Sequence, residues 1–465
     1  MKMKSLLFII ACLIICLIPS VGMLFFPTTE STENRSMAAA PELLTGEGAL
    51  NTDFFRDFEG YFDQRIALRN QLVYADAKIQ TTIFQESNVD GVIYGTDGWL
   101  YYASTLDDYL GTSVMSRREL YNLAHNFLVV QEYLGERNVA FVLTIPPNKN
   151  TLYGENMPYY DSYVVNSDHN AKLLAPFLSE QEISYLNLFD LFEAQDETLY
   201  LLRDSHWNMK GACMAYNGIM DTLEMEHEEY SMVDPVLEKN ENGDLNRMLY
   251  SFYGELEENY SYDISQEYIY ANDVDSVEAG WIITENASGT GSLLMFRDSF
   301  ANTLIPFLSN EFERAYYSKG VPNALERYVE EYSPDCVVIE IVERNISTYL
   351  NNPPILTAVE TELPENITIS STDATVTMES CENDVNYHKI SGTIPADRIQ
   401  DNSEIMVAVN GHVYRSYQIG ENDYSLYLKK SAFTEDSVSV QVYVVNEDSC
   451  TRVLSEDIKL SQGME

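Results

Sequence analysis

Two short polar segments of the sequence carry side chains suited to acyl-transfer chemistry. The first holds Asp204 and His206, two positions apart. Alternate side chains of an extended segment share a face, so the carboxylate can contact the imidazole, fix its tautomer and stabilise its protonated form. This spacing predicts a general base, His206, with Asp204 as its orienting acid. Taken alone, such a pair is also typical of a surface contact or a structural histidine.

The second segment contains Ser299, which follows an apolar run at residues 292–296 and precedes a helical pattern that continues to residue 309. A hydroxyl at such a turn is exposed above the carboxyl edge of a sheet, and N–H groups at the helix start can hold an oxyanion. Helix capping is the commoner role of an Asp-Ser pair. The two segments together favour Ser299 as a nucleophile with His206 as its base.

The elements that would position these residues alternate between amphipathic and apolar segments. The helical patterns cover residues 118–134, 170–178, 208–223 and 323–332, and the apolar runs cover 139–145, 292–296 and 336–342. Apolar runs of this kind are typical of strands covered on both faces, and their alternation with helices predicts a mostly parallel α/β sheet. Active sites in such sheets lie at the carboxyl ends of the strands.

Different patterns flank this region. An apolar stripe at residues 53–84 predicts a helix, and residues 93–102 predict a hairpin. From residue 363 onward, short alternating runs predict an all-β sandwich with a hairpin turn at Asn410-Gly411. Four tyrosines of this sandwich could stack on sugars or simply fill the strands. They are Tyr414, Tyr417, Tyr424 and Tyr427.

The N-terminus reads as an export or anchor segment. Lys2 and Lys4 precede residues 5–26, which contain no charged residue. Such a run can cross a membrane as a helix with the lysines on the cytoplasmic side. We favour an uncleaved single-pass anchor over a cleaved signal peptide, because Phe25-Phe26-Pro27 lacks a cleavage pattern. The main domains are then extracytoplasmic, either held at the cell membrane or secreted if cleavage occurs.

These patterns divide the chain into four parts. We predict an anchor or signal at residues 1–27, a stalk and helical brace at 28–90, a catalytic α/β domain at 91–352 and a β-sandwich, a candidate glycan-binding domain, at 363–462.

Charge and cysteine content narrow the function classes. The chain of 465 residues carries 73 Asp and Glu against 28 Lys and Arg, a formal charge of −45. This balance argues against nucleic acid and anionic membrane surfaces as partners. No Cys or His spacing of a metal site appears, so no metal or cofactor is expected. Cys381 and Cys450 could pair in an exported compartment or remain buried thiols.

A set of short motifs carries a family resemblance across roughly residues 33–349. The motifs are Glu33-Asn34-Arg35 with Pro41, Asp63-Gln64-Arg65, Asp97-Gly98-Trp99-Leu100, Pro146-Pro147-Asn148-Lys149, Asp204-Ser205-His206-Trp207, Gly243-Asp244-Leu245, Asp298-Ser299-Phe300 and Glu340-Ile341-Val342-Glu343-Arg344. In content and order they resemble the SGNH-hydrolase-like O-acetyltransferases of the alginate acetylation (AlgX/AlgJ-like) type and the related DHHW family. The resemblance implies a circularly permuted SGNH-like parallel sheet flanked by helices.

The resemblance also implies roles for individual residues. Ser299, His206 and Asp204 match the family's nucleophile, base and orienting acid. Arg297 departs from the pattern, since SGNH enzymes generally have glycine at that position. For the oxyanion we name the Ser299 N–H and Asn148. Three cations beside the site are candidate oxyanion or substrate contacts, although for Lys149 and Arg344 we favour a structural role in pairs with acidic residues. They are Lys149, Arg297 and Arg344.

The function implied is acetyl transfer onto hydroxyls of a cell-surface or exported polysaccharide, with a membrane-bound O-acyltransferase as acetyl donor partner. A carbohydrate esterase with the same triad and a non-catalytic scaffold for polysaccharide assembly are the alternatives. Because a polyuronate would be repelled by a charge of −45, we expect a neutral or amino-sugar acceptor. Arg203, Arg297 and Lys149 could form one basic spot at the rim.

Overall fold

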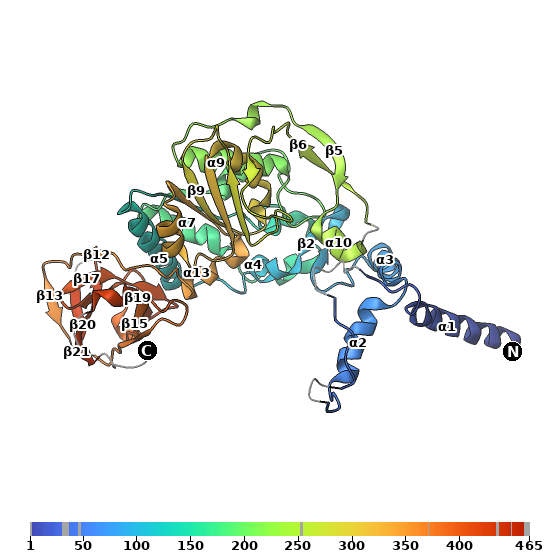
Figure 1. The fold of residues 1–465 in the computed structure, drawn as a ribbon, viewed down its shortest axis with the longest axis horizontal. Coiled ribbons are helices and arrows are strands. Elements are labelled where there is room, and N and C mark those ends of the chain that lie inside the picture. The colour runs from blue at the N-terminus through green and yellow to red at the C-terminus, as the bar shows by residue number, and fades with distance from the viewer. Residues whose placement is uncertain are drawn as a thin grey trace.

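The computed structural model describes residues 2–29, 37–44, 48–251, 254–370, 372–433, 437–447 and 449–459. The motif Glu33-Asn34-Arg35 lies outside these residues. Figure 1 shows an α/β body at the centre, a β-rich part at one end and an extended N-terminal helix at the other.

A seven-stranded sheet of order β4-β3-β11-β9-β10-β8-β7 forms the α/β body. Neighbours from β4 to β10 pair in parallel, and β8 pairs antiparallel with both β10 and β7. Its strands are β3 (Ala140–Thr144), β4 (Tyr185–Leu186), β7 (Ile269–Tyr270), β8 (Trp281–Glu285), β9 (Ser292–Arg297), β10 (Arg314–Lys319) and β11 (Cys336–Glu340). The predicted strands correspond to β3, β9 and β11, and the prediction missed the other four.

Helices cover both faces of this sheet because its central strands are apolar throughout. Alternate residues of β3 point to opposite sides: Phe141 packs in the cluster that contains α5, and Val142 packs in the cluster that contains α9. The helices around the sheet are α5 (Arg117–Gly135), α6 (Lys149–Leu152), α7 (Asn170–Glu180), α8 (Leu188–Glu193), α9 (Met209–Thr222), α11 (Ile305–Glu311), α12 (Leu325–Tyr332) and α13 (Ser347–Asn351). The predicted mixed α/β class with a mostly parallel sheet is confirmed.

The segment before the sheet is less regular than predicted. Instead of one helix over 53–84, the chain forms α2 (Phe54–Arg65), α3 (Arg69–Ile79) and a π-helical turn (Gln80–Phe84). The helix breaks because Leu68 adopts a φ of 62° and the Ala67 N–H donates to the carbonyl of Pro19 instead of continuing the ladder. The predicted hairpin is present as β1 (Val92–Tyr94) and β2 (Leu100–Tyr102).

Further short elements lie beside the hairpin and the body. They are α4 (Leu106–Leu110), α10 (Asp244–Tyr250) and the antiparallel pair β5 (Val236–Glu241) and β6 (Glu257–Ser261).

Two packed sheets form the C-terminal region, as expected for a sandwich. One has the order β12-β17-β16-β20-β21-β13 and the other β14-β15-β19-β18. Side chains of both share one core, for example Val407 and Leu426. The strands are β12 (Glu360–Thr361), β13 (Ile367–Ile369), β14 (Thr377–Ser380), β15 (Tyr387–Thr393), β16 (Glu404–Val409), β17 (His412–Arg415), β18 (Tyr417–Ile419), β19 (Asp423–Lys429), β20 (Ser437–Asn446) and β21 (Ser449–Lys459).

Buried side chains settle two open questions about this sandwich. Tyr417, Tyr424 and Tyr427 are buried, so they fill the strands and present no ring for stacking, and Tyr414 is partly buried against the same core. Cys381 and Cys450 are free buried thiols and do not pair.

Helix α5 covers the open edge of β18. Asn126 and Gln418 exchange two hydrogen bonds, of 2.9 and 2.8 Å, through the Asn126 amide and the Gln418 backbone. The His125 ring lies 3.0 Å from the Ser416 carbonyl. A side-chain amide thus imitates the missing neighbouring strand, which satisfies the edge and joins the sandwich to the α/β body.

Helix α1 (Lys2–Gly22) is the single helix, among the described residues, that is long and apolar enough to cross a membrane. Its apolar side chains are exposed, and Figure 1 shows it projecting out of the body. It fits a single-pass anchor or a signal.

Candidate active site

Strand β9 ends in a turn that is held from both sides by Asp298. One carboxylate oxygen of Asp298 accepts the Phe300 N–H at 2.9 Å, and the other accepts the Val342 N–H beyond β11 at 2.8 Å. The Asp298 N–H donates to buried Glu340 at 2.8 Å. These bonds tie the ends of β9 and β11 together and leave Ser299, partly exposed, at the start of the helical turn Phe300–Thr303.

His206 comes from a tight loop that packs against this turn. Trp207 donates its indole N–H to Thr303 at 2.7 Å and meets the Phe300 ring edge-on at 5.1 Å. The His206 ring also contacts Phe300, with centroids 4.7 Å apart. After the loop, the Asn208 side chain caps α9 by accepting the N–H groups of Lys210 and Gly211.

The structure brings the three predicted residues into one chain of contacts. His206 Nε2 lies 2.8 Å from Ser299 Oγ, and His206 Nδ1 lies 2.6 Å from Asp204 Oδ1. Asp204 also accepts the His206 N–H at 2.9 Å, so the carboxylate fixes both the ring and its backbone. The three side chains are within the hydrogen-bond reach that a serine mechanism needs.

Asp244 is a fourth residue in this chain of contacts, and the sequence prediction gave it no role. Its backbone N–H donates to Asp204 Oδ2 at 2.7 Å. Its carboxylate accepts the Ser205 N–H at 2.8 Å and the Ser205 hydroxyl at 2.6 Å. Asp244 therefore fixes both sides of the loop that presents His206. Its motif, Gly243-Asp244-Leu245, was the available signal.

Electrostatics favour a charged imidazole. Burial lowers the pKa of His206, but Asp204, its hydrogen bond, Asp244 and Asp298 outweigh burial and raise that pKa to about 9. Burial raises the pKa of Asp204, and the contacts with His206 more than reverse this, so Asp204 stays ionised. For Asp244, burial and the Asp204 charge raise the pKa.

Asp204, His206 and Asp244 also have the donor types of a metal site, with ligand atoms within 4.8 Å of one another. Their atoms are already committed, however. The proton on His206 Nδ1 is shared with Asp204, and both Asp244 oxygens accept hydrogen bonds from Ser205. The set therefore fits a proton relay better than a cation site.

Gly243 allows Asp244 to approach the loop. A Cβ at Gly243 would lie 2.4 Å from the Arg203 carbonyl oxygen and 2.9 Å from the Asp204 Cβ. We predict that Gly243→Ala displaces Asp244 and lowers kcat/KM about 10–100-fold. Gly60→Ala is the control, because a Cβ there meets no atom within 4 Å. Steady-state hydrolysis of a small acetyl ester measures both; equal rates for the two variants would refute the role of Gly243.

Lys149 is buried and holds backbone rather than substrate. Its ammonium donates to the carbonyls of Leu100 and Leu202, both at 2.7 Å, and of Asp204 at 2.9 Å. The lysine joins the hairpin to the His206 loop. Burial lowers the pKa of Lys149, against the opposing charges of three carboxylates, to about 7.

Replacing Lys149 should therefore destabilise the protein. Lys149→Met removes the hydrogen bonds to three carbonyls, of which the Leu202 carbonyl still accepts the Leu100 N–H. We expect a loss of about 2–4 kcal/mol, seen as a fall of several degrees in the apparent melting temperature. Lys172→Met is the control, because its half-exposed ion pair with Glu193 contributes about 0–1 kcal/mol. A melting temperature unchanged in both variants would contradict this.

Arg297 and Arg203 do not form the basic spot suggested by the sequence. Arg297 is 1% exposed and donates to the carbonyls of Asp298, Val277 and Ala279 and to the Asn302 side chain. Arg203 is held by Glu255, through its carbonyl at 3.0 Å and its carboxylate at 3.6 Å. Like Lys149, both arginines donate hydrogen bonds to main-chain carbonyls. These three cations therefore form no basic patch at the rim.

Asn148 and Arg344 lie at the ends of β3 and β11. The Asn148 side chain donates to Asp108 at 3.0 Å, and its N–H donates to buried Glu343 at 2.7 Å. Arg344 is partly exposed, with its guanidinium 5.3 Å from the centre of the Tyr102 ring. Neither residue has a described hydrogen bond to Ser299, His206 or Asp204.

The fold and the site together define an α/β protein with a serine, histidine and aspartate relay at the carboxyl edge of a parallel sheet. Residues 92–287 match the family described as "SGNH hydrolase-like domain, acetyltransferase AlgX". The resemblance to AlgX-type SGNH hydrolase-like acetyltransferases is therefore confirmed over this segment, which is less than half of the chain. The matched range contains Asp204, His206 and Asp244 and ends before Ser299.

Among solved structures, Bacillus cereus PatB1 with a sulfonyl adduct is 18% identical, over 56% of this chain and 96% of that chain, with a TM-score of 0.44. A DHHW family protein from Eubacterium siraeum is 16% identical, over 56% and 93%, with a TM-score of 0.41. The O-acetyltransferase domain of Pseudomonas putida AlgJ is 18% identical, over 55% and 92%, with a TM-score of 0.37. No curated protein matches the sequence.

Proposed function

We propose that the protein is an extracytoplasmic O-acetyltransferase that moves an acetyl group through Ser299 onto hydroxyls of a cell-surface or exported polysaccharide. The observation that carries this proposal is the 2.8 Å contact of His206 with Ser299, beside a segment that matches the AlgX-type acetyltransferase domain. Helix α1 supports a site held outside the cell membrane.

The mechanism is a double displacement. Ser299 Oγ forms a bond to the carbonyl carbon of the donor's acetyl group while His206 Nε2 accepts the hydroxyl proton and passes it to the leaving group. An acceptor hydroxyl then gives its proton to His206 and attacks the acetyl-serine. Ser299 is released when that bond breaks and the proton returns to its oxygen.

The tetrahedral intermediate needs hydrogen-bond donors. The Ser299 backbone N–H has no hydrogen-bond partner among the described residues and stands at a helical start, which supports it as one donor. For Asn148 to be the second, its amide would have to leave Asp108. Arg344, partly exposed at the end of β11, is the cation we propose for substrate contact.

The partners follow from location and charge. We propose a membrane-bound O-acyltransferase as the acetyl donor, reached through α1. The formal charge of −45 and the absence of free rim cations at Lys149, Arg203 and Arg297 support a neutral or amino-sugar acceptor.

The decisive test uses the purified full-length protein in detergent with p-nitrophenyl acetate and a glucosamine hexamer. We expect O-acetylated oligosaccharide by mass spectrometry. Acetate release without any transfer product would favour a carbohydrate esterase. Absence of both, with unchanged glycan acetylation in a Ser299→Ala strain, would favour a non-catalytic scaffold.

A further inference from the structure

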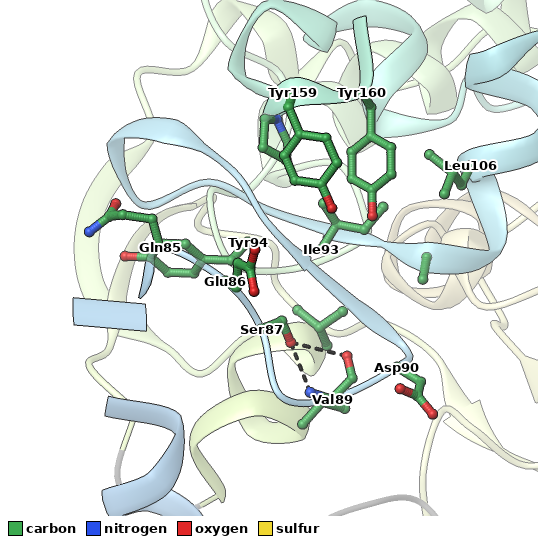
Figure 2. Close-up of a pocket in the computed structure, with 13 residues that line it drawn as sticks. Gln85, Glu86, Ser87, Val89, Asp90, Ile93, Tyr94, Leu106, Tyr159 and Tyr160 are labelled. Carbon is green, nitrogen blue, oxygen red and sulfur yellow. Dashed lines mark hydrogen bonds between the residues drawn. The ribbon is translucent and has the colours of Figure 1, made fainter. Parts of the chain in front are cut away.

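We propose that a pocket remote from Ser299, between the end of the brace and the hairpin, binds a neutral or amino-sugar unit of the acceptor. We call it the brace pocket; it is formed by residues 85–90, strand β1, Leu106 of α4 and the pair Tyr159 and Tyr160. The pocket has a volume of about 330 Å³. Figure 2 shows the residues that line it. This inference rests on the proposed function, since it names part of that reaction's acceptor site.

Aromatic rings form one wall of the brace pocket. Tyr159 and Tyr160 stack with their centroids 4.7 Å apart, and Tyr159 is 60% exposed. In Figure 2 both hydroxyls point toward Ile93, whose side chain lies in the floor of the pocket. An exposed tyrosine face beside an apolar floor suits the C–H face of a sugar ring, and the hydroxyls suit its polar edge.

The polar groups on the side of the brace pocket opposite the tyrosines are hydrogen-bond acceptors. The carboxylates of Glu86 and Asp90 are exposed and have no hydrogen bond or ion pair with any described residue. The Gln85 amide donates to the carbonyls of Thr81 and Thr82, which leaves its oxygen free to accept. Sugar hydroxyls and ammonium groups are donors that match these three acceptors.

Charge selects among sugars. No Lys, Arg or His lines the brace pocket, so a uronate would meet only like charge at Glu86 and Asp90. A sugar with a free amine would instead gain two ion pairs. The pocket therefore favours amino sugars over neutral sugars and both over acidic ones.

The brace pocket and Ser299 share one rim of the molecule. Leu106 lines the pocket, and Asp108 on the same short helix holds Asn148 at the end of β3. β3 is next to β11, which is next to β9 and Ser299. A glycan that reaches both must cross about two strand spacings, roughly 10 Å, and helix α4. Only an acceptor several sugar units long can do so.

The test measures binding to the full-length Ser299→Ala protein, which removes turnover. We expect a glucosamine hexamer to bind more tightly than an N-acetylglucosamine hexamer, and a mannuronate hexamer not to bind. Tyr159→Ala should weaken glucosamine hexamer binding about tenfold, and Glu86→Gln with Asp90→Asn should remove the preference for the amine. Tyr270→Ala, an exposed tyrosine of β7 outside the pocket, should leave binding unchanged.

A second readout separates this inference from the proposed function. In the active protein, Tyr159→Ala should raise KM for the hexamer about tenfold without changing p-nitrophenyl acetate hydrolysis. Binding that Tyr159→Ala leaves intact, or equal binding of the mannuronate hexamer, would overturn the brace pocket even if acetyl transfer is confirmed. Tyr159-dependent binding in a protein that never transfers acetate would overturn the proposed function and leave the pocket standing.

Discussion

Ser299→Ala is expected to lower the rate of acetyl transfer about 10³–10⁶-fold, because the Ser299 hydroxyl is the one nucleophile that contacts His206 Nε2 among the described residues. The matched control is Ser205→Ala. The Ser205 hydroxyl also lies near His206, 3.4 Å from Nδ1, but it donates to Asp244 and faces away from the nucleophile side. Its loss should cost at most about tenfold.

Initial rates of p-nitrophenyl acetate hydrolysis and intact mass after mixing with excess ester measure this contrast. Wild type and Ser205→Ala should gain one acetyl group, and Ser299→Ala should gain none. Acetylation that persists in Ser299→Ala and disappears in Ser205→Ala would show that Ser205, on the Nδ1 side of the imidazole, is the nucleophile instead.

Asp204→Asn is expected to lower the value of kcat/KM that is reached at high pH about 10³–10⁴-fold, and to change the pH dependence of kcat/KM. His206 acts as a base only when it is neutral, so activity should rise with pH as the imidazole deprotonates through about 9. The substitution removes the carboxylate charge that raises this pKa, so the midpoint of the variant should move toward lower pH.

The pH profile of kcat/KM tests this prediction. Asp97→Asn is the control, since Asp97 is exposed in the hairpin turn with a φ of 52° that asparagine tolerates. A variant with the wild-type midpoint would show that Asp204 does not set the pKa of His206, whatever the fall in rate.

The proximity of the three proposed triad residues could be predicted because their local signals are strong. Ser299 directly follows an apolar strand, and Asp204 is two residues from the histidine that it contacts. Asp244 could not be found in this way, because its contact joins it to Asp204, 40 positions away, across a polar, aperiodic stretch. Spacing reveals contacts within one element, whereas contacts between loops depend on the fold.

The errors of the prediction also have physical causes. β10 was missed because it begins and ends at the charged residues Arg314 and Lys319, although Ala315 and Tyr317 between them are buried. Arg297 and Lys149 were considered for a basic spot at the rim because each stands beside a proposed site residue in the sequence. Here several carbonyls from separate segments converge on each one, and convergence of that kind is not visible in a sequence.

The contact of Asp204 with His206 sets stability and activity against each other. A histidine whose pKa rises from about 6.5 to about 9 on folding contributes stability that is complete below pH 6.5 and is lost as the pH rises through 9. Asp204, whose pKa is lowered, adds its share above about pH 4. The pair therefore stabilises the loop most between about pH 4 and about pH 6.5, where His206 is charged and cannot accept a proton. If His206 is the base, as we propose, the protein obtains the neutral imidazole only by losing part of the interaction that holds the imidazole in place.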